Sequence, residues 1–482
     1  MVWPKRVRSL LSGDVKLGFT AATLFIIVYF LWFAADGLRA TFAPDDPYNI
    51  YYYWLRGPRE LIRANILFFT SYYRPLGGLY YLPMYSLFGF SPLPYRLVCF
   101  ALLLANLYLF YRFACLLTGD PAIAVLATLL GSYHAQLTNL YVSNSTIYDI
   151  LCFLFYMSAL IYYLRLRQAG RLPTGPQILI VQALYVCALN AKEMAISLPI
   201  CLGIYELGNH APSSYRPRAI AAWFCREGRT AAIGVLLTAL YVAGKVLGPD
   251  SLARMPAYRP VYTLRRFFET SGAYMGELFY APHRFSAAGT LVIWFALIAF
   301  GWMMKSKALK FCSLYVVVVL LPLYFVPPRE GFVLYLPIVG WAIFLAVLLV
   351  RCYDWAARSP QARALGIRAR LPVLFFLAVA VLGSVHAAKK RHIAPFTFHA
   401  MKLTWTTIQQ LQRQVPRLPR GARVLFRNSP FGDNWDLYFI AKLHFHDPSL
   451  KVALCDDPRP EPRGDIISGF DYVFTFENGK LR

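Results

Sequence analysis

The stretch LGFTAATLFIIVYFLWFAA (residues 17–35) decides the fold class, and FAPDDPYN (42–49) follows it closely. The first run carries no charge and has the length, about 20 residues, that crosses a hydrocarbon core ~30 Å thick. Two adjacent carboxylates, Asp45 and Asp46, therefore stand where the chain is expected to leave a membrane. Because bare acids are unfavourable at a bilayer surface, this placement suggests that something there requires them.

Composition extends the membrane prediction to the whole chain. Of its 482 residues, 58% are hydrophobic and 15% are charged, and the mean hydropathy is +0.46. Apolar runs of spanning length recur along the sequence, so we expect a multi-pass membrane protein in a lipid bilayer. The net charge of +25 is typical of cytoplasmic loops that face anionic lipid, so no nucleic acid is expected as a partner.

The distribution of basic residues sets the expected topology. One ambiguous stretch, PLGGLYYLPMYSLFGF (75–90), is short and is interrupted by Pro83 and by glycines. If it does not cross, the basic N-terminus and four later basic loops are all cytoplasmic, which the positive-inside rule favours. We therefore expect 75–90 to lie at the outer surface, with eleven spans elsewhere. These predicted spans are residues 17–35, 95–116, 121–139, 148–164, 176–190, 194–208, 230–248, 288–304, 311–326, 333–350 and 371–387.

This topology divides the chain into a transmembrane domain, 1–387, and a C-terminal domain, 388–482. The transmembrane domain has a first outer loop at 36–94, which carries the Asp pair and interfacial helices, and another outer loop at 249–287. In the tail, the pattern from ARVLFR onwards predicts strand, loop, helix and strand, and DYVFTF followed by ENGK predicts another strand and a turn. The expected fold class is an α-helical polytopic membrane protein with about 11 transmembrane helices and a small α/β extracytoplasmic domain.

Ionisable residues gather at the outer ends of the spans rather than at their middles. NAKE (190–193) places Lys192 and Glu193 at an outer turn, and YYRPL (72–76) places Arg74 just before the interfacial helix. Such groups at membrane depth commonly serve a function, and in a transporter they are expected near the midplane. Their confinement to one surface favours chemistry or binding at the outer face. A solvated helix hairpin and an arginine that snorkels towards head groups are the structural alternatives.

A reaction on a sugar linked to a lipid phosphate would use all of these groups. Arginine holds phosphate through paired N–H donors, and a carboxylate near the anomeric carbon takes the proton from an attacking hydroxyl. A divalent cation such as Mg²⁺ or Mn²⁺, held by oxygen ligands, can neutralise the phosphate. Asp45 and Asp46 can divide the roles of base and metal ligand, although adjacent aspartates are also common as solvated surface or as helix caps.

Taken together, the motifs resemble the GT-C class of integral-membrane glycosyltransferases. The pattern is most similar to the transmembrane O-mannosyltransferases with tetratricopeptide repeats and their bacterial relatives. The repeats themselves are absent, and the α/β tail stands in their place. The matching pieces follow the family's order over residues 17–350: the Asp pair, YRPL (73–76), HAQLTNLYVSNSTIYDIL (134–151), NAKEMAISLP (190–199) and GFVLYLPIVG (331–340).

The resemblance implies an inverting transfer of a sugar from a polyprenyl-phosphate-linked donor, with Asp45 or Asp46 as the catalytic base. The acceptor, a protein, lipid or glycan, lies outside the cytoplasm. The implied location is a bacterial inner membrane with a cytoplasmic N-terminus and an extracytoplasmic C-terminal domain. The residues expected to line the donor phosphate or its metal are Arg74, Lys192, Glu193 and Arg329, with Asp46 and Glu193 as the metal ligands.

The second outer loop, with His134, Asn139 and Asp149, both matches and departs from this family. Asp149 matches, but Asn139 stands where the family carries a glutamate, and Ile147 stands where it carries an arginine. Because Asn139 replaces an acid, metal dependence stays open. Two other functions also stay open, namely a non-catalytic scaffold derived from such an enzyme, and a transporter or flippase for lipid-linked saccharides.

Overall fold

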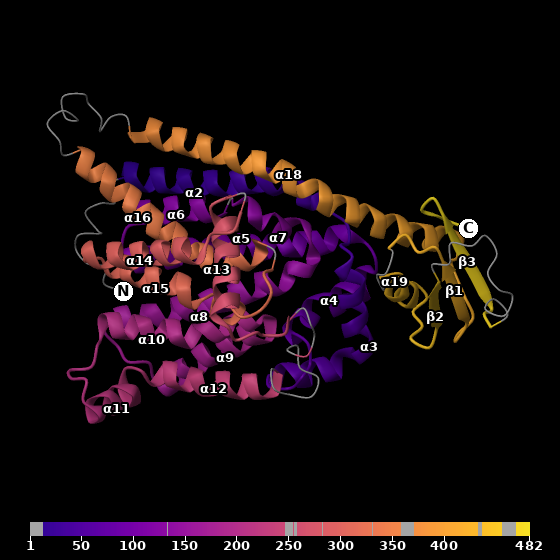
Figure 1. The fold of residues 1–482 in the computed structure, drawn as a ribbon, viewed down its shortest axis with the longest axis horizontal. Helices are drawn as coiled ribbons and strands as arrows, with labels where there is room; N and C mark the ends of the chain where they lie inside the picture. Colours follow the sequence, from indigo (N-terminus) through magenta and orange to yellow (C-terminus); the bar gives the residue numbers. More distant parts are fainter. Residues whose placement is uncertain are drawn as a thin grey trace.

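Helices dominate the structure, a computed structural model that describes residues 13–132, 134–245, 254, 258–281, 283–329, 331–357, 371–431, 436–455 and 469–482. Each of the eleven predicted spans contains a helix, and these helices run side by side in one bundle (Figure 1). Their bounds are α2 Gly13–Ala34, α5 Pro92–Thr118, α6 Pro121–Ser132, α8 Ile147–Gln168, α9 Gly175–Ala191, α10 Leu198–Asn209, α12 Arg229–Lys245, α14 Ala287–Met303, α15 Lys307–Val318, α16 Pro337–Ala357 and α18 Leu371–Gln414.

Fewer helices qualify as spans by length and composition than the sequence predicts. Within the described residues, three are long and apolar enough to cross a membrane: Pro92–Thr118, Asn144–Gln168 and Pro337–Trp355. Pro121–Ser132, Gly175–Ala191 and Ala287–Met303 are apolar but shorter. Polar turns explain the shortening, because α6 ends at Ser132 before the His134 loop and α9 ends at the NAKE turn.

Short helical elements fill the connections. In the His134 loop these are η2 Ala135–Leu137, α7 Thr138–Val142 and η3 Asn144–Thr146. The others are η1 Ala35–Arg39, η4 Glu193–Ser197, α11 Pro217–Arg226, α13 Leu264–Leu278, η7 Leu321–Leu323 and η8 Gly331–Tyr335. We call the end of the bundle that carries the NAKE turn and the Asp pair the outer end, following the predicted topology.

Two helices of the first outer loop cover this outer end. They are α3 Asp45–Ile66 and α4 Pro75–Phe88, and they pack against each other (Figure 1). The expectation of a helix within 75–90 is therefore met by α4, which buries Tyr80, Tyr81 and Tyr85. α3 bends at Gly57, whose φ of 75° lies in the left-handed region that favours glycine. Pro58 follows and restarts the helix, because proline fits a first helical turn.

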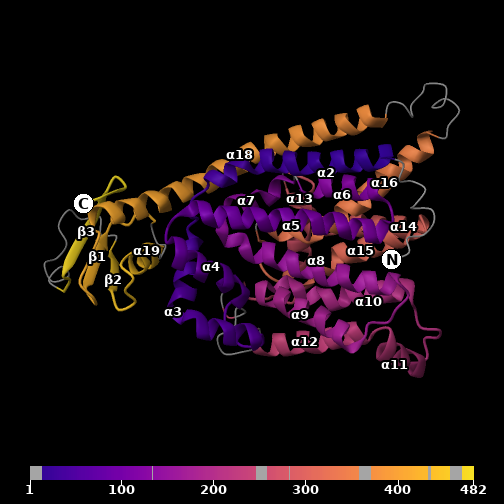
Figure 2. The same cartoon turned by 180° about the vertical axis from the view of Figure 1, so that it is seen from behind.

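The C-terminal domain is joined to the bundle by one continuous helix. α18 runs for 44 residues beside α2 and on to the sheet, so the boundary expected at residue 388 lies inside it (Figure 2). The reason is an uninterrupted helical period after the apolar part: Met401, Thr404, Ile408 and Leu411 recur at three- and four-residue spacing and are all buried.

Beyond α18, the predicted α/β pattern is confirmed. The strands are β1 Arg423–Arg427, β2 Lys451–Cys455, β3 Tyr472–Glu477 and β4 Lys480–Leu481, and α19 Asp436–His444 lies between β1 and β2. The sheet has the order β2-β1-β3-β4, with β1 parallel to both of its neighbours and β4 antiparallel to β3. α19 packs on α3, which places the small domain at the outer end of the bundle (Figures 1 and 2).

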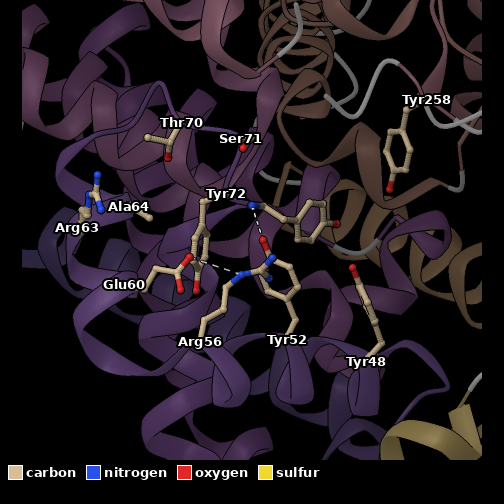
Figure 3. A pocket seen from close by; sticks show the side chains of 11 residues that line it. Tyr48, Tyr52, Arg56, Glu60, Arg63, Ala64, Thr70, Ser71, Tyr72 and Tyr258 are labelled. Carbon is tan, nitrogen blue, oxygen red and sulfur yellow. Dashed lines mark hydrogen bonds and ion pairs between the residues drawn. The ribbon is translucent and has the colours of Figure 1, made fainter. Parts of the chain in front are cut away.

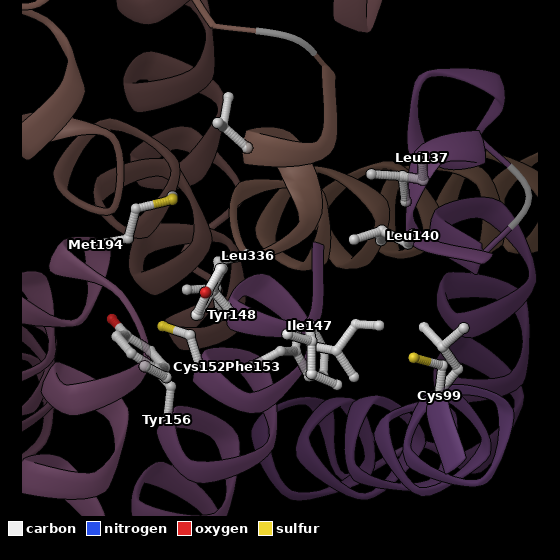
Figure 4. Packing of buried hydrophobic residues seen from close by; sticks show 14 of the residues in the cluster. Cys99, Leu137, Leu140, Ile147, Tyr148, Cys152, Phe153, Tyr156, Met194 and Leu336 are labelled. Atoms are coloured by element: carbon white, nitrogen blue, oxygen red, sulfur yellow. The ribbon is translucent and has the colours of Figure 1, made fainter. Parts of the chain in front are cut away.

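The core of the bundle surrounds α8. Ile147, Cys152, Phe153 and Tyr156 of this helix are buried among residues of neighbouring helices and outer turns (Figure 4). Buried tyrosine hydroxyls need partners, and several pair with one another or with backbone carbonyls. Tyr53 of α3 and Tyr148 of α8, for example, are 3.0 Å apart at their hydroxyl oxygens. This pairing locks the first outer loop onto the bundle.

Candidate active site

A cavity of about 370 Å³ opens at the outer end, where the NAKE turn meets α12 and the segment before η8. Much of its wall is apolar, with Ile196, Val242, Leu321, Leu323, Phe325 and Val326 among the lining residues. Four cations and one carboxylate also line it: Arg74, Lys192, Lys245, Arg329 and Glu193. The structure thus brings together all four residues that were predicted to hold the donor phosphate.

Arg74 enters the cavity from a strained backbone. Its φ of 37° lies in the left-handed region, and the Tyr53 hydroxyl donates a hydrogen bond to its carbonyl at 2.9 Å. The guanidinium donates to Glu193 twice, from Nε to Oε1 at 3.1 Å and from Nη2 to Oε2 at 2.8 Å. Burial opposes the ionisation of Glu193, but the charge and hydrogen bonds of Arg74 outweigh it and lower the pKa of Glu193 to about 2. The pair is therefore ionised at neutral pH.

Lys192 forms a separate ion pair, with Asp149. Its ammonium donates to the Asp149 carboxylate, in the first turn of α8, and lies 4.6 Å from the centre of the Phe332 ring. Of the second-outer-loop residues, Asp149 is thus the one that joins the cation cluster. His134 instead stacks on Tyr280, with ring centres 4.5 Å apart, and its Nε2 lies 2.9 Å from the Leu278 carbonyl oxygen.

Asn139, in the same loop, is half-buried and does not line the cavity. Its carbonyl oxygen accepts a hydrogen bond from the Thr146 hydroxyl at 3.2 Å, which ties α7 to η3.

Lys245 and Arg329 complete the cation cluster. Lys245 is buried and donates to the carbonyl of Tyr72 at 3.0 Å, and no carboxylate among the described residues forms an ion pair with it. The Arg329 guanidinium lies 3.9 Å from the centre of the Tyr258 ring. Lys245 was visible in the sequence as a lysine at the outer end of a span, but it was not assigned a role. Nothing in the sequence pointed to a role for Tyr258, because it lies in a long loop without a motif.

The two adjacent aspartates have different environments. Asp46 is fully buried and accepts hydrogen bonds from the Ala43 amide at 2.8 Å, the Tyr81 hydroxyl at 3.1 Å and the Asn144 side chain at 3.3 Å. Burial raises the pKa of Asp46 to about 7, although Arg96 and the first two of these donors lower it. Asp45 begins α3 and its side chain is exposed at the surface, although the surrounding protein removes part of its hydration and so raises the pKa of its carboxyl. Asp45 is thus the member of the pair that an incoming molecule can reach.

A third carboxylate, Asp436, comes from the C-terminal domain. α19 and α3 run parallel, since Tyr48 contacts Phe439 with ring centres 5.2 Å apart and Trp54 contacts His446 at 6.3 Å. The first residues of both helices therefore lie at the same end. Burial raises the pKa of Asp436 to about 7, and the negative charges of Asp45 and Asp46 add to this effect. Sequence reasoning missed this residue, because only the docking of the tail brings it near the pair.

The residues predicted to bind a divalent metal do not fit that role as a set. Asp46 is enclosed by three donors from its own network, and both Glu193 oxygens accept from Arg74. In the part of the chain that the structure describes, no three His, Cys, Asp or Glu side chains form a metal-binding group. Mg²⁺ or Mn²⁺ dependence therefore stays a prediction of the sequence, and no chemical step is assigned to a metal.

No protein-family model and no curated protein matches the chain. Among solved structures, the chain is similar to the crystal structure of ArnT from Cupriavidus metallidurans bound to undecaprenyl phosphate. The TM-score is 0.49 and the identity 14%, covering 93% of this chain and 87% of that one. ArnT is a glycosyltransferase of the GT-C class, the class that the sequence motifs resemble.

Proposed function

We propose that the chain is a membrane glycosyltransferase that moves a sugar from a polyprenyl-phosphate-linked donor to an acceptor at the outer face. The observation that carries this proposal is the cavity in which an apolar wall meets Arg74, Lys192, Lys245 and Arg329. A polyprenyl phosphate has the same two halves, an apolar chain and a compact anion. The match in chemistry supports a lipid phosphate as the bound group.

The cations have distinct parts in this proposal. Arg74 and Lys192 are held by Glu193 and Asp149, so their positions are set before a ligand arrives. Lys245 makes a hydrogen bond to a neutral carbonyl, and no carboxylate among the described residues lies within ion-pair distance of its ammonium. We assign Lys245 the main contact with the phosphate. Preorganised cations of this kind stabilise the charge that a phosphate gains when it leaves.

Asp45 is the proposed base, and Asp46 supports it. The exposed Asp45 carboxylate takes the proton of an acceptor hydroxyl while the hydroxyl oxygen forms a bond to the anomeric carbon. The bond between that carbon and the phosphate oxygen breaks, and its electron pair goes to the phosphate. Attack from the side opposite the phosphate inverts the anomeric configuration. Asp46 holds the start of α3 through its buried hydrogen bonds.

Binding of undecaprenyl phosphate to the full chain in nanodiscs tests the proposal. We expect saturable binding that weakens at least about tenfold in Lys245→Met, since a charged hydrogen bond contributes about 1.5–3 kcal/mol. Lys310→Met is the matched control, because Lys310 lies beside Trp302 and outside the cavity. Undecaprenyl-phosphate-linked sugars then report activity as release of the lipid phosphate, which Asp45→Asn should abolish while binding persists. Absence of saturable binding in the folded wild-type chain would overturn the proposal.

A further inference from the structure

A second cavity, of about 430 Å³, lies against α3 and is separate from the candidate donor site (Figure 3). One wall comes from α3 and another from the segment that leads to Arg74. On α3, Tyr48, Tyr52 and Arg56 recur at four-residue spacing and so lie on one face. Glu60 and Arg63 continue the wall beyond the bend at Gly57. The bend lets both halves of α3 face the same space.

The two cavities are neighbours that share Tyr258 as a common wall. Tyr73 lines the second cavity, whereas the next residue, Arg74, lines the first. Figure 3 shows the hydroxyls of Tyr48 and Tyr258 directed into the same space. Tyr48 lies one helical turn after Asp45. A molecule in the second cavity therefore lies beside the candidate donor site, and the Tyr48 end of the cavity is one helical turn from the candidate base.

The lining chemistry suits a polyhydroxylated ring. Tyr48, Tyr52 and Tyr72 present aromatic faces together with hydroxyls, and aromatic faces stack on the C–H surfaces of sugar rings. One hydroxyl also lacks a partner: Tyr72 is only 7% exposed, and its hydroxyl oxygen makes no hydrogen bond with any described residue. Buried polar groups normally find partners. The oxygen of this hydroxyl is covered in the free chain, so a ligand supplies the missing hydrogen bond after a neighbouring side chain shifts.

The charges of the cavity favour an acid group on that ligand. Glu60 forms an ion pair with Arg56, in which Oε1 of Glu60 lies 3.7 Å from Nε of Arg56. The Arg56 guanidinium also lies 3.7 Å from the centre of the Tyr52 ring. The Arg63 side chain is exposed, and its guanidinium forms no ion pair or hydrogen bond with the described residues. Its guanidinium is free to hold a carboxylate or a phosphate through paired donors.

From these observations we propose that the second cavity is the acceptor site, and that the acceptor is a saccharide with a carboxylate or phosphate group. This inference rests on the proposed function, since it names the second substrate of the same reaction. The ring lies among Tyr48, Tyr52 and Tyr72, and its acid group is held by Arg63. Its reacting hydroxyl lies at the Tyr48 end of the cavity, one helical turn from Asp45.

Binding of defined saccharides to the full chain in phosphatidylcholine nanodiscs tests the inference. The probes are trigalacturonate, which carries carboxylates, mannose 6-phosphate, which carries a phosphate, and neutral maltotriose. We expect at least one acidic probe to bind more tightly than maltotriose. Arg63→Ala should weaken it about tenfold, the effect of losing a charge-assisted hydrogen bond. Arg59→Ala is the matched control, because Arg59 is an exposed arginine on the same helix and does not line the cavity.

Tyr72→Phe should affect saccharide binding without lowering the stability of the fold. Its hydroxyl has no described partner in the free chain, so its removal should leave the Tm unchanged or higher while saccharide binding weakens several-fold. Tyr324→Phe is the control, because it removes another buried hydroxyl without a described partner, outside both cavities. Equal binding of neutral and acidic probes, unaffected by Arg63→Ala and Tyr72→Phe, would overturn the inference.

Undecaprenyl phosphate binding, measured on the same samples, distinguishes the two proposals. If the lipid phosphate binds and no saccharide does, the acceptor site is wrong and the proposed function stands. If an acidic saccharide binds with the expected variant pattern and the lipid phosphate does not, the cavity is a saccharide site and the transferase proposal is wrong. If neither binds, both are wrong.

Discussion

Arg74 and Glu193 are 119 residues apart in sequence, yet they form a bidentate ion pair in which both guanidinium-to-carboxylate hydrogen bonds are 3.1 Å or shorter. The pair ties the segment before α4 to the turn that follows α9. It also fixes the wall of the cavity in which the lipid phosphate is proposed to bind. The strained backbone of Arg74 is held by this pair and by the Tyr53 hydroxyl.

Breaking this pair on one side should destabilise the chain. Glu193→Gln keeps the shape of the side chain but leaves the buried Arg74 charge without its counter-ion, which we expect to cost about 3 kcal/mol. Arg74→Met combined with Glu193→Gln should recover part of that loss, because it removes the uncompensated charge. Unfolding in detergent of the two single variants and the double variant measures the coupling between the two residues. Additive effects of the two changes would show that the pair does not act as a unit.

Substitutions of the two aspartates of the first outer loop should have different effects, one on activity and the other on stability. Asp45→Asn should lower transfer by at least about a thousandfold, as expected for a lost general base with further positioning roles, while the Tm changes little. Asp46→Ala should instead lower the stability by about 2–4 kcal/mol, because three buried donors lose their acceptor. Measurement of the Tm and of lipid-phosphate release in both variants tests these two expectations. Full activity in Asp45→Asn would remove it as the base.

The sequence predicted the helical bundle and its outer cation cluster because both depend on local signals. Apolar runs define helices, and NAKE and YRPL mark where charges interrupt them, so Arg74, Lys192 and Glu193 were found and do meet. The partners of these charges were less predictable. Asp149 and His134 lie in the same loop motif, but Asp149 pairs with Lys192 and His134 packs on Tyr280. That choice depends on how the loop folds over α8.

The contribution of two buried aspartates to stability should grow on acidification. Burial raises the pKa of Asp46 and of Asp436 to about 7, whereas an unfolded aspartate has a pKa of about 3.9. At these two positions the folded state therefore binds more protons than the unfolded state between about pH 4 and 7, so their contribution to stability falls as the pH rises through this window. We expect the Tm at pH 5, taken relative to the Tm at pH 8, to be higher in the wild-type chain than in the Asp46→Asn/Asp436→Asn chain.

The control for this pH dependence is Asp354→Asn, which changes an exposed aspartate at the end of α16. It should leave the difference between the two pH values unaltered. The same difference in Tm between the two pH values in the wild-type and Asp46→Asn/Asp436→Asn chains would contradict the prediction.

The bend of α3 should depend on glycine at position 57. Gly57→Ala meets open space, since no atom lies within 4 Å of the added methyl group, but its φ of 75° is unfavourable for alanine by about 1–2 kcal/mol. We expect a lower Tm and weaker binding of the acidic saccharide, with undecaprenyl phosphate binding unchanged. Gly175→Ala is the control, because it is also free of contacts and has no positive φ. Equal effects of the two substitutions would mean that the bend is not required.

The second cavity and the docking of the C-terminal domain lay beyond sequence reasoning. The tyrosines of YNIYYYW (48–54) fit an interfacial aromatic belt as well as a binding surface, and only the fold shows which of them face a common space. Tyr258 and Asp436 are separated by long stretches of sequence from the residues they join. Neither belongs to a motif, so their roles depend on tertiary packing alone.

The continuity of α18 limits how the small domain can move. A 44-residue helix without a connecting loop is about 66 Å long at ~1.5 Å per residue. It connects the small domain to the bundle rigidly, unlike a flexible linker. The domain is held at a second point where α19 meets α3 through Tyr48 and Phe439. Two attachments of this kind oppose a swing of the small domain away from the bundle. The start of α19, with Asp436, therefore stays near the start of α3, with Asp45.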